Sequence, residues 1–185
     1  MDSGAEAYAR FLAGERDALG VLIAQYREGL ILYLSSIVGN LWTAEELAED
    51  TFVRLATRRP RDRGKSSFKT WLYTIGRNLA IDWLRKNRSA LSVPLEDAEQ
   101  YAADTESIEQ SYLRRERDRT LHSAMQQLKA EYRQVLWLVY FDGLPLRDAA
   151  AVMHKSVHST EMLVSRARNA LRTILEKEGF DYEIE

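Results

Sequence analysis

The sequence predicts an all-α protein of two small helical domains joined by an acidic, flexible linker. Good helix formers dominate, and only 9 glycines and 3 prolines occur in 185 residues. Apolar residues recur at three- and four-residue spacings in both halves, as in amphipathic helices, and no segment alternates with a period of two. Between the halves, residues 92–114 carry six acidic side chains and a single basic one, Arg114. This composition favours a linker between domains 1–91 and 115–185, although an acidic mimic of nucleic acid is the alternative.

Three helices are expected in the first domain. The first carries an apolar stripe formed by Leu19, Leu22, Ile23, Tyr26, Leu30 and Tyr33. The second opens at a capping box, Thr43–Glu46, and ends before Pro60. After a basic loop, Ser66 or Ser67 can cap a third helix that runs to about Asn87. Its expected apolar face consists of Phe68, Trp71, Leu72, Ile75 and Leu79.

The second domain is expected to end in a helix-turn-helix. Helices are predicted over residues 112–128 and 132–141, followed by a break at Asp142 and Gly143. Pro145 suits the first turn of a short helix over 146–153. A tight break follows, after which Ser156 can cap a longer final helix. Two helices joined by so brief a turn are typical of this DNA-binding motif.

Composition and missing motifs exclude several classes of protein. The absence of cysteine excludes disulfide scaffolds, cysteine–metal centres and thiol nucleophiles, and it is compatible with a reducing compartment. No phosphate-binding loop, nucleophile elbow, HExxH or GxGxxG sequence occurs, so we expect no enzymatic activity, no cofactor and no small-molecule substrate. His154 and His158 are four residues apart but straddle the expected turn, so we expect no metal site.

Membrane insertion and secretion are not expected. The apolar stretch from Leu30 to Val38 is interrupted by two serines and is far shorter than the roughly 20 residues of a membrane span. The first residues, MDSGAEAYAR, lack the basic flank and apolar region of a secretory signal. We therefore expect a cytoplasmic protein.

The net charge of −2 conceals an uneven distribution. Residues 1–91 hold 14 Lys and Arg against 11 Asp and Glu, whereas residues 115–185 hold 11 of each. Seven cations fall within sixteen residues and are opposed only by Asp62: Arg54, Arg58, Arg59, Arg61, Arg63, Lys65 and Lys69. Such a cluster attracts phosphates, and its binding weakens steeply with salt. The alternative is a solvated basic face.

Aromatic residues next to these cations favour binding to single-stranded nucleic acid. Tyr73 and Arg77 are four residues apart and share a helix face, with Thr70 one turn earlier and Asn78 beside them. Stacking of a base on an aromatic ring contributes about 1–3 kcal/mol, and an asparagine amide can pair with a base edge. The alternative for Tyr73 is a half-buried structural tyrosine.

Two segments of the chain resemble a known family. AEELAEDTFVRL (44–55) and SSFKTWLYTIGRNLAIDWLRKNR (66–88) look like domain 2 of an extracytoplasmic-function (group IV) sigma factor of the sigma-70 family. Residues 128–175 are similar to domain 4 of that family. The resemblance implies an alternative sigma factor that binds core RNA polymerase and directs promoter-specific transcription initiation. It also implies promoter DNA and an anti-sigma factor as partners.

The resemblance assigns residues to three surfaces. Core polymerase would be bound by Glu49, Asp50 and Arg54. The −10 element would be melted and held by Arg63, Lys65, Ser66, Ser67, Lys69, Tyr73, Arg77, Asn78 and Arg85. The −35 element would be bound by Lys155, Ser156, His158, Ser159, Glu161, Met162 and Arg166.

The expected recognition helix departs from the family pattern. His158 and Glu161-Met162-Leu163 stand where the family commonly has a small residue and then a cationic run. Glu161 can accept a hydrogen bond from cytosine N4, which would suit an altered −35 sequence, or it can simply favour the helix start electrostatically. We expect His158, Ser159, Met162 and Arg166 to face the major groove.

Two other functions remain as alternatives. One is a helix-turn-helix regulator that acts without being a polymerase subunit; the basic and aromatic segment 66–88 argues against it. The other is a helical adaptor without a nucleic-acid role, which would leave the cationic cluster without a purpose.

Overall fold

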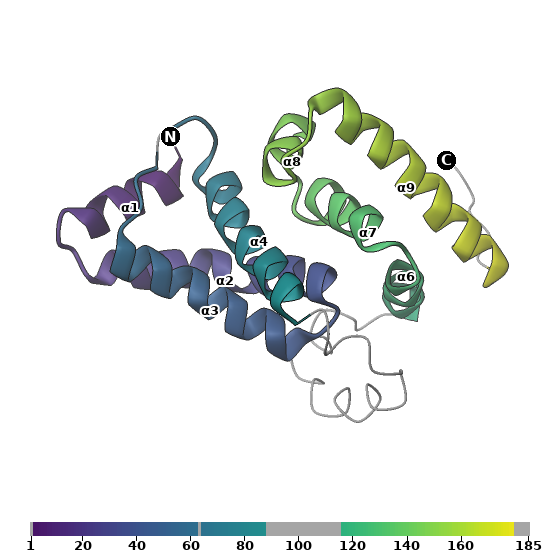
Figure 1. The fold of residues 1–185 in the computed structure, drawn as a ribbon, viewed down its shortest axis with the longest axis horizontal. Coiled ribbons are helices and arrows are strands. Elements are labelled where there is room, and N and C mark those ends of the chain that lie inside the picture. Colours follow the sequence, from purple (N-terminus) through teal and green to yellow (C-terminus); the bar gives the residue numbers. More distant parts are fainter. Residues whose placement is uncertain (1, 63, 88–115, 180–185) are drawn as a thin grey trace.

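A computed structural model describes residues 2–62, 64–87 and 116–179, and the regular elements of this part of the chain are all helices (Figure 1). The expected linker and Arg63 lie outside the described residues, as does the segment 180–185. The N-terminal unit contains α1 (Ser3–Leu12), α2 (Asp17–Val38), α3 (Leu41–Arg58) and α4 (Phe68–Lys86). The C-terminal unit contains α6 (Glu116–Gln126), α7 (Ala130–Leu136), η3 (Trp137–Phe141), α8 (Leu146–Val152) and α9 (Val157–Lys177).

Helix α2 is the centre of the fold. It packs against α1, α3 and α4 in its own unit and against α7 and η3 in the other. The expected stripe is confirmed, because Leu22, Tyr26, Leu30 and Tyr33 are buried. By length and composition α2 is also apolar enough to cross a membrane, with a mean hydropathy of 1.3 in its most apolar window. Its contacts on both sides explain that character as core packing.

Side-chain capping explains where four of the described helices begin: α1, α3, α4 and α9. The side chain of Ser67 accepts from the N–H of Thr70, and that of Ser156 accepts from the N–H of Ser159, as predicted for α4 and α9. The predicted capping box at Thr43 is wrong. Asn40 caps α3 instead, accepting from the N–H of Thr43 at 3.0 Å, so Thr43 already lies inside the first turn.

Helix α1 was not predicted from the apolar pattern. The carboxylate of Asp2 caps it, with Oδ1 accepting from the N–H of Gly4 at 3.0 Å. The second oxygen of the same carboxylate accepts from the N–H of Phe68, the first residue of α4. Tyr8 and Phe11 of α1 are buried and pack on the core. Helix α1 is therefore tied to the start of α4.

The C-terminal unit contains the predicted helix-turn-helix. The expected helix over 132–141 is α7 followed by a widened π-type turn, in which the N–H of Asp142 donates to Trp137 O, five residues earlier, at 3.0 Å. Pro145 precedes α8, and His154 adopts a left-handed conformation (φ 54°) in the turn before α9. The predicted breaks at 142–143 and 154–155 are confirmed.

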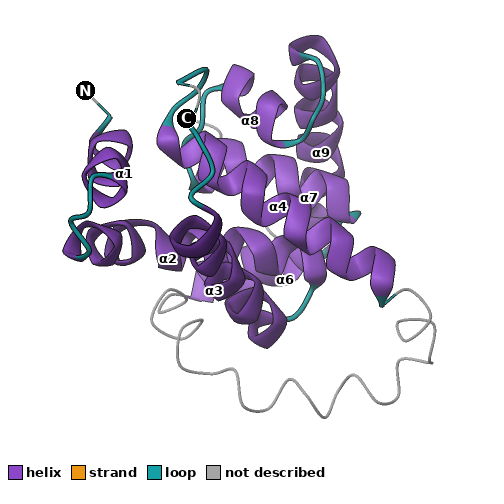
Figure 2. Cartoon of the chain, turned by 60° about the vertical axis from the view of Figure 1, so that its left-hand side comes forward, coloured by secondary structure: helices purple, strands orange, loops and turns teal. Residues whose placement is uncertain are grey.

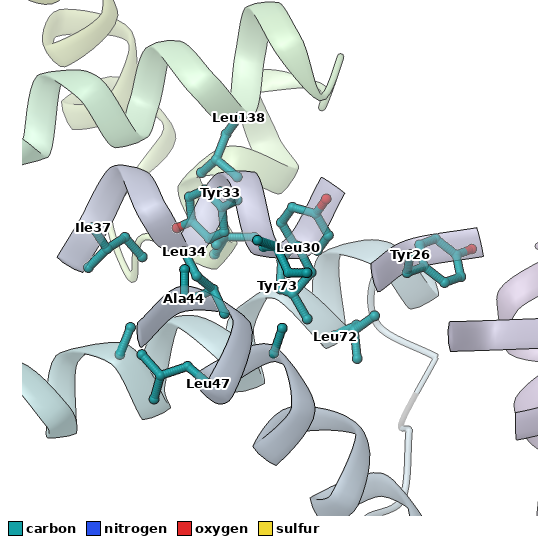
Figure 3. Close-up of a cluster of buried hydrophobic side chains, with 14 of the residues drawn as sticks. Tyr26, Leu30, Tyr33, Leu34, Ile37, Ala44, Leu47, Leu72, Tyr73 and Leu138 are labelled. Carbon is teal, nitrogen blue, oxygen red and sulfur yellow. The ribbon is translucent and has the colours of Figure 1, made fainter. Parts of the chain in front are cut away.

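The two units are docked on one another through a shared core. Helix α4 packs against α8, and α2 packs against α7 and η3 (Figures 1 and 2). Leu138 of η3 lies next to Tyr33 of α2, in a buried cluster that also contains Leu30 and Tyr73 (Figure 3). The hydrophobic core therefore runs from one unit into the other rather than forming two separate cores.

Candidate nucleic-acid and polymerase interfaces

The outer face of α3 is acidic and apolar. Glu49 and Asp50 are exposed and Arg54 is half-buried. Glu49 makes a long ion pair with Arg27 of α2, at 3.7 Å. Trp42 is 68% exposed and shares a helix face with Glu49, because the two are seven residues apart. Sequence reasoning missed Trp42; its signal was a large apolar residue outside the buried stripe.

Helix α1 holds the loop between α3 and α4 in place. The hydroxyl of Tyr8 donates to Pro60 O at 2.7 Å, and burial raises the pKa of Tyr8 to about 12. The guanidinium of Arg59 lies over the ring of Phe11, 5.5 Å from its centroid. Beyond this anchored part, Lys65 is exposed. The loop is thus held against α1 at Arg59 and Pro60.

Two predicted −10 residues, Lys69 and Tyr73, are engaged by the C-terminal unit. Lys69 Nζ lies 3.1 Å from Asp142 Oδ1 and donates to Asp142 O at 3.0 Å. The hydroxyl of Tyr73 donates to the same Oδ1 at 3.0 Å. The ring of Tyr73 is buried and stacks on Tyr33, with centroids 5.2 Å apart. Both side chains therefore contact the carboxylate of Asp142, which lies at the C-terminal end of η3.

The next turn of α4 is engaged in the same way. Arg77 Nε donates to Gln134 Oε1 of α7 at 3.4 Å. Asn78 Oδ1 lies 3.0 Å from Nε2 of His154, the left-handed residue of the helix-turn-helix turn. Arg85, in the last turn of α4, is exposed and forms only a long ion pair with Asp82, at 3.6 Å. The structure thus brings Lys69, Tyr73, Arg77 and Asn78 together on the side of α4 that contacts the C-terminal unit, and Asn78 is exposed there.

Asp142 occupies an unfavourable place for a carboxylate. Its side chain is 8% exposed, and Oδ2 is buried without a hydrogen-bond partner in the described chain. Burial raises the pKa of Asp142, while Lys69 and Tyr73 offset part of this rise. Sequence reasoning saw this residue only as a helix break. Its partners are 69 and 73 positions away, and no local pattern could have identified them.

Most of the predicted −35 residues are more exposed to solvent than Lys69, Tyr73 and Arg77 of α4. His158, Ser159, Glu161, Met162 and Arg166 are all exposed on α9. His158, Met162 and Arg166 follow one another at four-residue spacing and share a face. Ser156 serves as the helix cap, and Lys155 is half-buried and pairs with Glu131 of α7 at 2.7 Å. No group of three potential metal ligands occurs among the described residues.

Comparison with known proteins identifies the family. Residues 22–90 match Sigma-70 region 2, and residues 118–171 match Sigma-70 region 4. The chain is 33% identical to the RNA polymerase sigma-H factor of Pseudomonas aeruginosa over 175 residues, 90% of this chain and 91% of the relative. It is 28% identical to the ECF RNA polymerase sigma factor SigW of Bacillus subtilis over 167 residues, 86% and 89% of the two chains.

A solved structure supports the fold. The sigma factor RpoE of Bartonella quintana, determined in complex with the anti-sigma factor NepR, has a TM-score of 0.65 at 24% identity and covers 86% of this chain and 98% of its own. The matches to Sigma-70 regions 2 and 4, and the helix-turn-helix formed by α8 and α9, agree with the family resemblance seen in the sequence. The chain belongs to the extracytoplasmic-function sigma factors of the sigma-70 family.

Proposed function

We propose that this protein binds core RNA polymerase as an alternative sigma factor and selects promoters by their −10 and −35 elements. The observation that carries the proposal is the clustering of Lys69, Tyr73, Arg77 and Asn78 on one side of α4, beside an anchored basic loop. The cations of this cluster suit a phosphate and the exposed amide of Asn78 suits a base edge, while the ring of Tyr73 is buried against Tyr33. The protein is not an enzyme and acts in the cytoplasm, where promoter DNA and polymerase are found.

Three surfaces divide the work. The acidic and apolar face of α3, with Glu49, Asp50 and Arg54, contacts core polymerase. The loop and α4 contact the −10 element, with Arg63, Lys65, Ser66, Ser67 and Arg85 supplementing the cluster. The exposed face of α9 and the residues before it contact the −35 element. Residues 1–91, 92–114 and 115–185 then act as sigma domain 2, linker and sigma domain 4.

Two substitutions separate the first two surfaces. Asp50→Lys reverses a charge on α3 and is expected to weaken core polymerase binding by about tenfold, a loss of roughly 1.4 kcal/mol. Asn78→Ala is expected to preserve core binding and to impair promoter opening. Core binding is measured by fluorescence anisotropy and opening by permanganate footprinting of promoter DNA. Glu6→Lys, an exposed charge reversal on α1, is the control for Asp50→Lys.

The alternatives make different predictions in the same assays. A helix-turn-helix regulator would bind duplex DNA but not core polymerase, and an adaptor would bind neither. Failure of the wild-type protein to bind core polymerase refutes the proposal. We further propose that an anti-sigma factor restrains this protein, because the Bartonella quintana neighbour of the same fold was determined with one.

A further inference from the structure

We propose that helix α1 sets how sharply the protein selects its −10 element, by holding both ends of the loop between α3 and α4, with Tyr8 as the positioning residue. This inference rests on the proposed function of that loop and α4. The match to Sigma-70 region 2 begins at residue 22, so α1 lies before it in the chain. Tyr8 contacts no DNA in this proposal and acts only through the loop.

Two aromatic residues of α1 hold the start of the loop. The hydroxyl of Tyr8 donates to the backbone carbonyl of Pro60 at 2.7 Å. The guanidinium of Arg59 lies over the ring of Phe11, 5.5 Å from its centroid. Tyr8 and Phe11 are both buried. Breaking the Tyr8 bond would leave a buried hydroxyl without this partner, which is costly, so the loop backbone is held at Pro60.

Arg59 belongs to this attachment rather than to the cations that would bind phosphate. It follows the last residue of α3 and adopts a left-handed conformation, with φ 44°. That conformation is unfavourable for a residue with a β-carbon and persists where surrounding contacts fix it. Phe11 supplies such a contact through its ring. The chain therefore leaves α3 in a direction that α1 helps to determine.

The same helix holds the end of the loop. Oδ2 of Asp2, the residue that caps α1, accepts from the N–H of Phe68, the first residue of α4. The ring of Phe68 is buried and packs on that of Tyr8, with centroids 5.6 Å apart. Tyr8 also packs on Trp71, one turn into α4, at 5.3 Å. A single side chain of α1 thus contacts the elements on both sides of the loop.

Close packing at Gly4 fixes where α1 lies on α4. A β-carbon at this position would lie 2.6 Å from Cδ1 of Phe68, closer than such atoms approach one another. No side chain therefore fits between this point of α1 and the start of α4. The helix has one seat on α4, and the two attachments of the loop have a fixed position relative to α4.

The candidate −10 residues Lys65, Ser66 and Ser67 lie between the two attachments, at Pro60 and Phe68. Reading a base edge requires hydrogen-bonding groups at defined positions, whereas attraction of a phosphate depends far less on exact placement. Releasing the loop at Pro60 should therefore weaken discrimination between −10 sequences more than it weakens general attraction of DNA.

The experiment uses the full chain assembled with core RNA polymerase. A promoter is first selected from a random-sequence library by the wild-type assembly. Two derivatives then carry one base substitution each, in the −10 or in the −35 element. Opening rates, measured by permanganate reactivity of unpaired thymines, give a −10 ratio and a −35 ratio, each the rate of the selected promoter over that of the derivative. A loss of folded or polymerase-bound protein lowers every rate alike and cancels in both ratios.

Two variants release the start of the loop by different means. Tyr8→Phe keeps the buried ring and removes the hydroxyl that donates to Pro60 O. We expect its −10 ratio to fall about threefold to tenfold, the range of one net hydrogen bond. Phe11→Leu keeps an apolar side chain and removes the ring beneath Arg59, for a fall of about twofold to fivefold. The −35 ratio and core polymerase affinity should stay at their wild-type values in both.

Tyr26→Phe is the matched control. It removes the hydroxyl of another buried tyrosine whose ring also packs on Phe68, with centroids 5.4 Å apart, but which belongs to α2. Both ratios should keep their wild-type values in this variant. Circular dichroism identifies any variant that fails to fold, and Phe11→Leu carries the test if Tyr8→Phe is lost.

A lower −10 ratio with an unchanged −35 ratio in Tyr8→Phe supports the proposal. An unchanged −10 ratio in the folded variant overturns it, and so does an equal fall in both ratios, which a merely structural role would produce. An equal fall of the −10 ratio in Tyr26→Phe overturns it as well. Failure of the wild-type protein to bind core polymerase, or to distinguish the −10 derivative, would instead refute the proposed function.

Discussion

Arg133 shows how much one side chain contributes to docking. Its Nε donates to Ser36 O at 2.7 Å, and its Nη1 donates to Gln126 O at 3.1 Å. Ser36 lies in the last turn of α2, where backbone carbonyls lack helical partners and the helix dipole favours a cation. Burial lowers the pKa of Arg133 somewhat, yet the guanidinium stays charged at neutral pH. The residue thus anchors α7 on the end of α2.

Replacing this anchor should cost stability. Arg133→Met keeps much of the apolar stem and removes the charged donors, so we expect the free energy of unfolding to fall by about 1.5–3 kcal/mol. Urea denaturation followed by circular dichroism measures the loss. Arg147→Met is the control, because Arg147 is 83% exposed and makes only a 3.9 Å ion pair with Asp148. Equal losses in the two variants would contradict the role of Arg133.

Tyr73 marks the limit of sequence reasoning about the site at this scale. The four-residue spacing correctly places Tyr73 and Arg77 on one side of α4, because spacing along a helix fixes which residues are neighbours. It does not reveal what faces them. Asp142 and Gln134 approach from a segment more than 50 residues away, and their own local sequence reads as a helix and a break.

At the scale of elements, α1 stabilises the loop between α3 and α4, which we propose contacts the −10 element. The carboxylate of Asp2 caps α1 and accepts from the N–H of Phe68 at the start of α4, and the Tyr8 hydroxyl donates to Pro60 O. Two helix N-termini then share one anion, which satisfies N–H groups in both and favours each helix dipole. The short first helix therefore sets the position of the α3–α4 connection.

Removing that shared cap tests the bracing role. Asp2→Ala removes the side-chain cap of α1 and the acceptor for the N–H of Phe68, while Ser67 still caps α4, and we expect a loss of about 1–2 kcal/mol in the free energy of unfolding. Asp2→Asn retains an acceptor oxygen and should lose less. Thermal unfolding by circular dichroism provides the measurement. Glu6→Ala, an exposed acidic residue in the same helix, should change stability little; a comparable effect there would rule out the shared cap.

The helices themselves were predicted to different extents for identifiable reasons. Ser67 and Ser156 were predicted as possible caps because a serine precedes an apolar pattern in each case. The prediction at Thr43 is wrong because Asn40, three residues earlier, is a better cap and starts the helix sooner. Helix α1 was missed although its sequence carries the usual signals, a capping Asp2 and buried residues Ala7, Tyr8 and Phe11 at helical spacing.

For the whole molecule, docking should depend on pH through Asp142. Burial raises the pKa of this carboxyl above its ordinary value of 3.8, against the opposing effects of Lys69 and Tyr73; Tyr33 lies near it as well. A raised pKa means that the folded state binds the proton more tightly than the unfolded chain. The resulting stabilisation is complete below pH 3.8 and is lost as the pH rises through the raised value.

Comparison with Asp142→Asn isolates this contribution. Asparagine resembles the protonated acid in shape and charge, so the variant lacks the titration. We expect the wild-type free energy of unfolding, relative to that of Asp142→Asn, to decrease as pH rises from about 4 to about 7. Urea denaturation at a series of pH values measures the difference. A relative gain with rising pH would show that the ion pair with Lys69 outweighs the cost of burial.

The sequence correctly indicated two helical regions, but not that they share a core. Periodicity describes each helix separately, and α2 and α4 present apolar residues on more than one side. One side packs inside the N-terminal unit and another packs against the C-terminal unit. The apolar pattern alone does not tell which side of each helix contacts which unit, because that depends on tertiary contacts.

Burial of Leu138 against Tyr33 has a consequence for handling the protein in pieces (Figure 3). Cutting the chain between the two units would turn this shared core into exposed apolar surface on both fragments. We therefore expect either half, expressed alone, to be less soluble than the intact chain and to associate with itself. Separation of the two units within the intact chain would expose the same surface, which another molecule would have to cover.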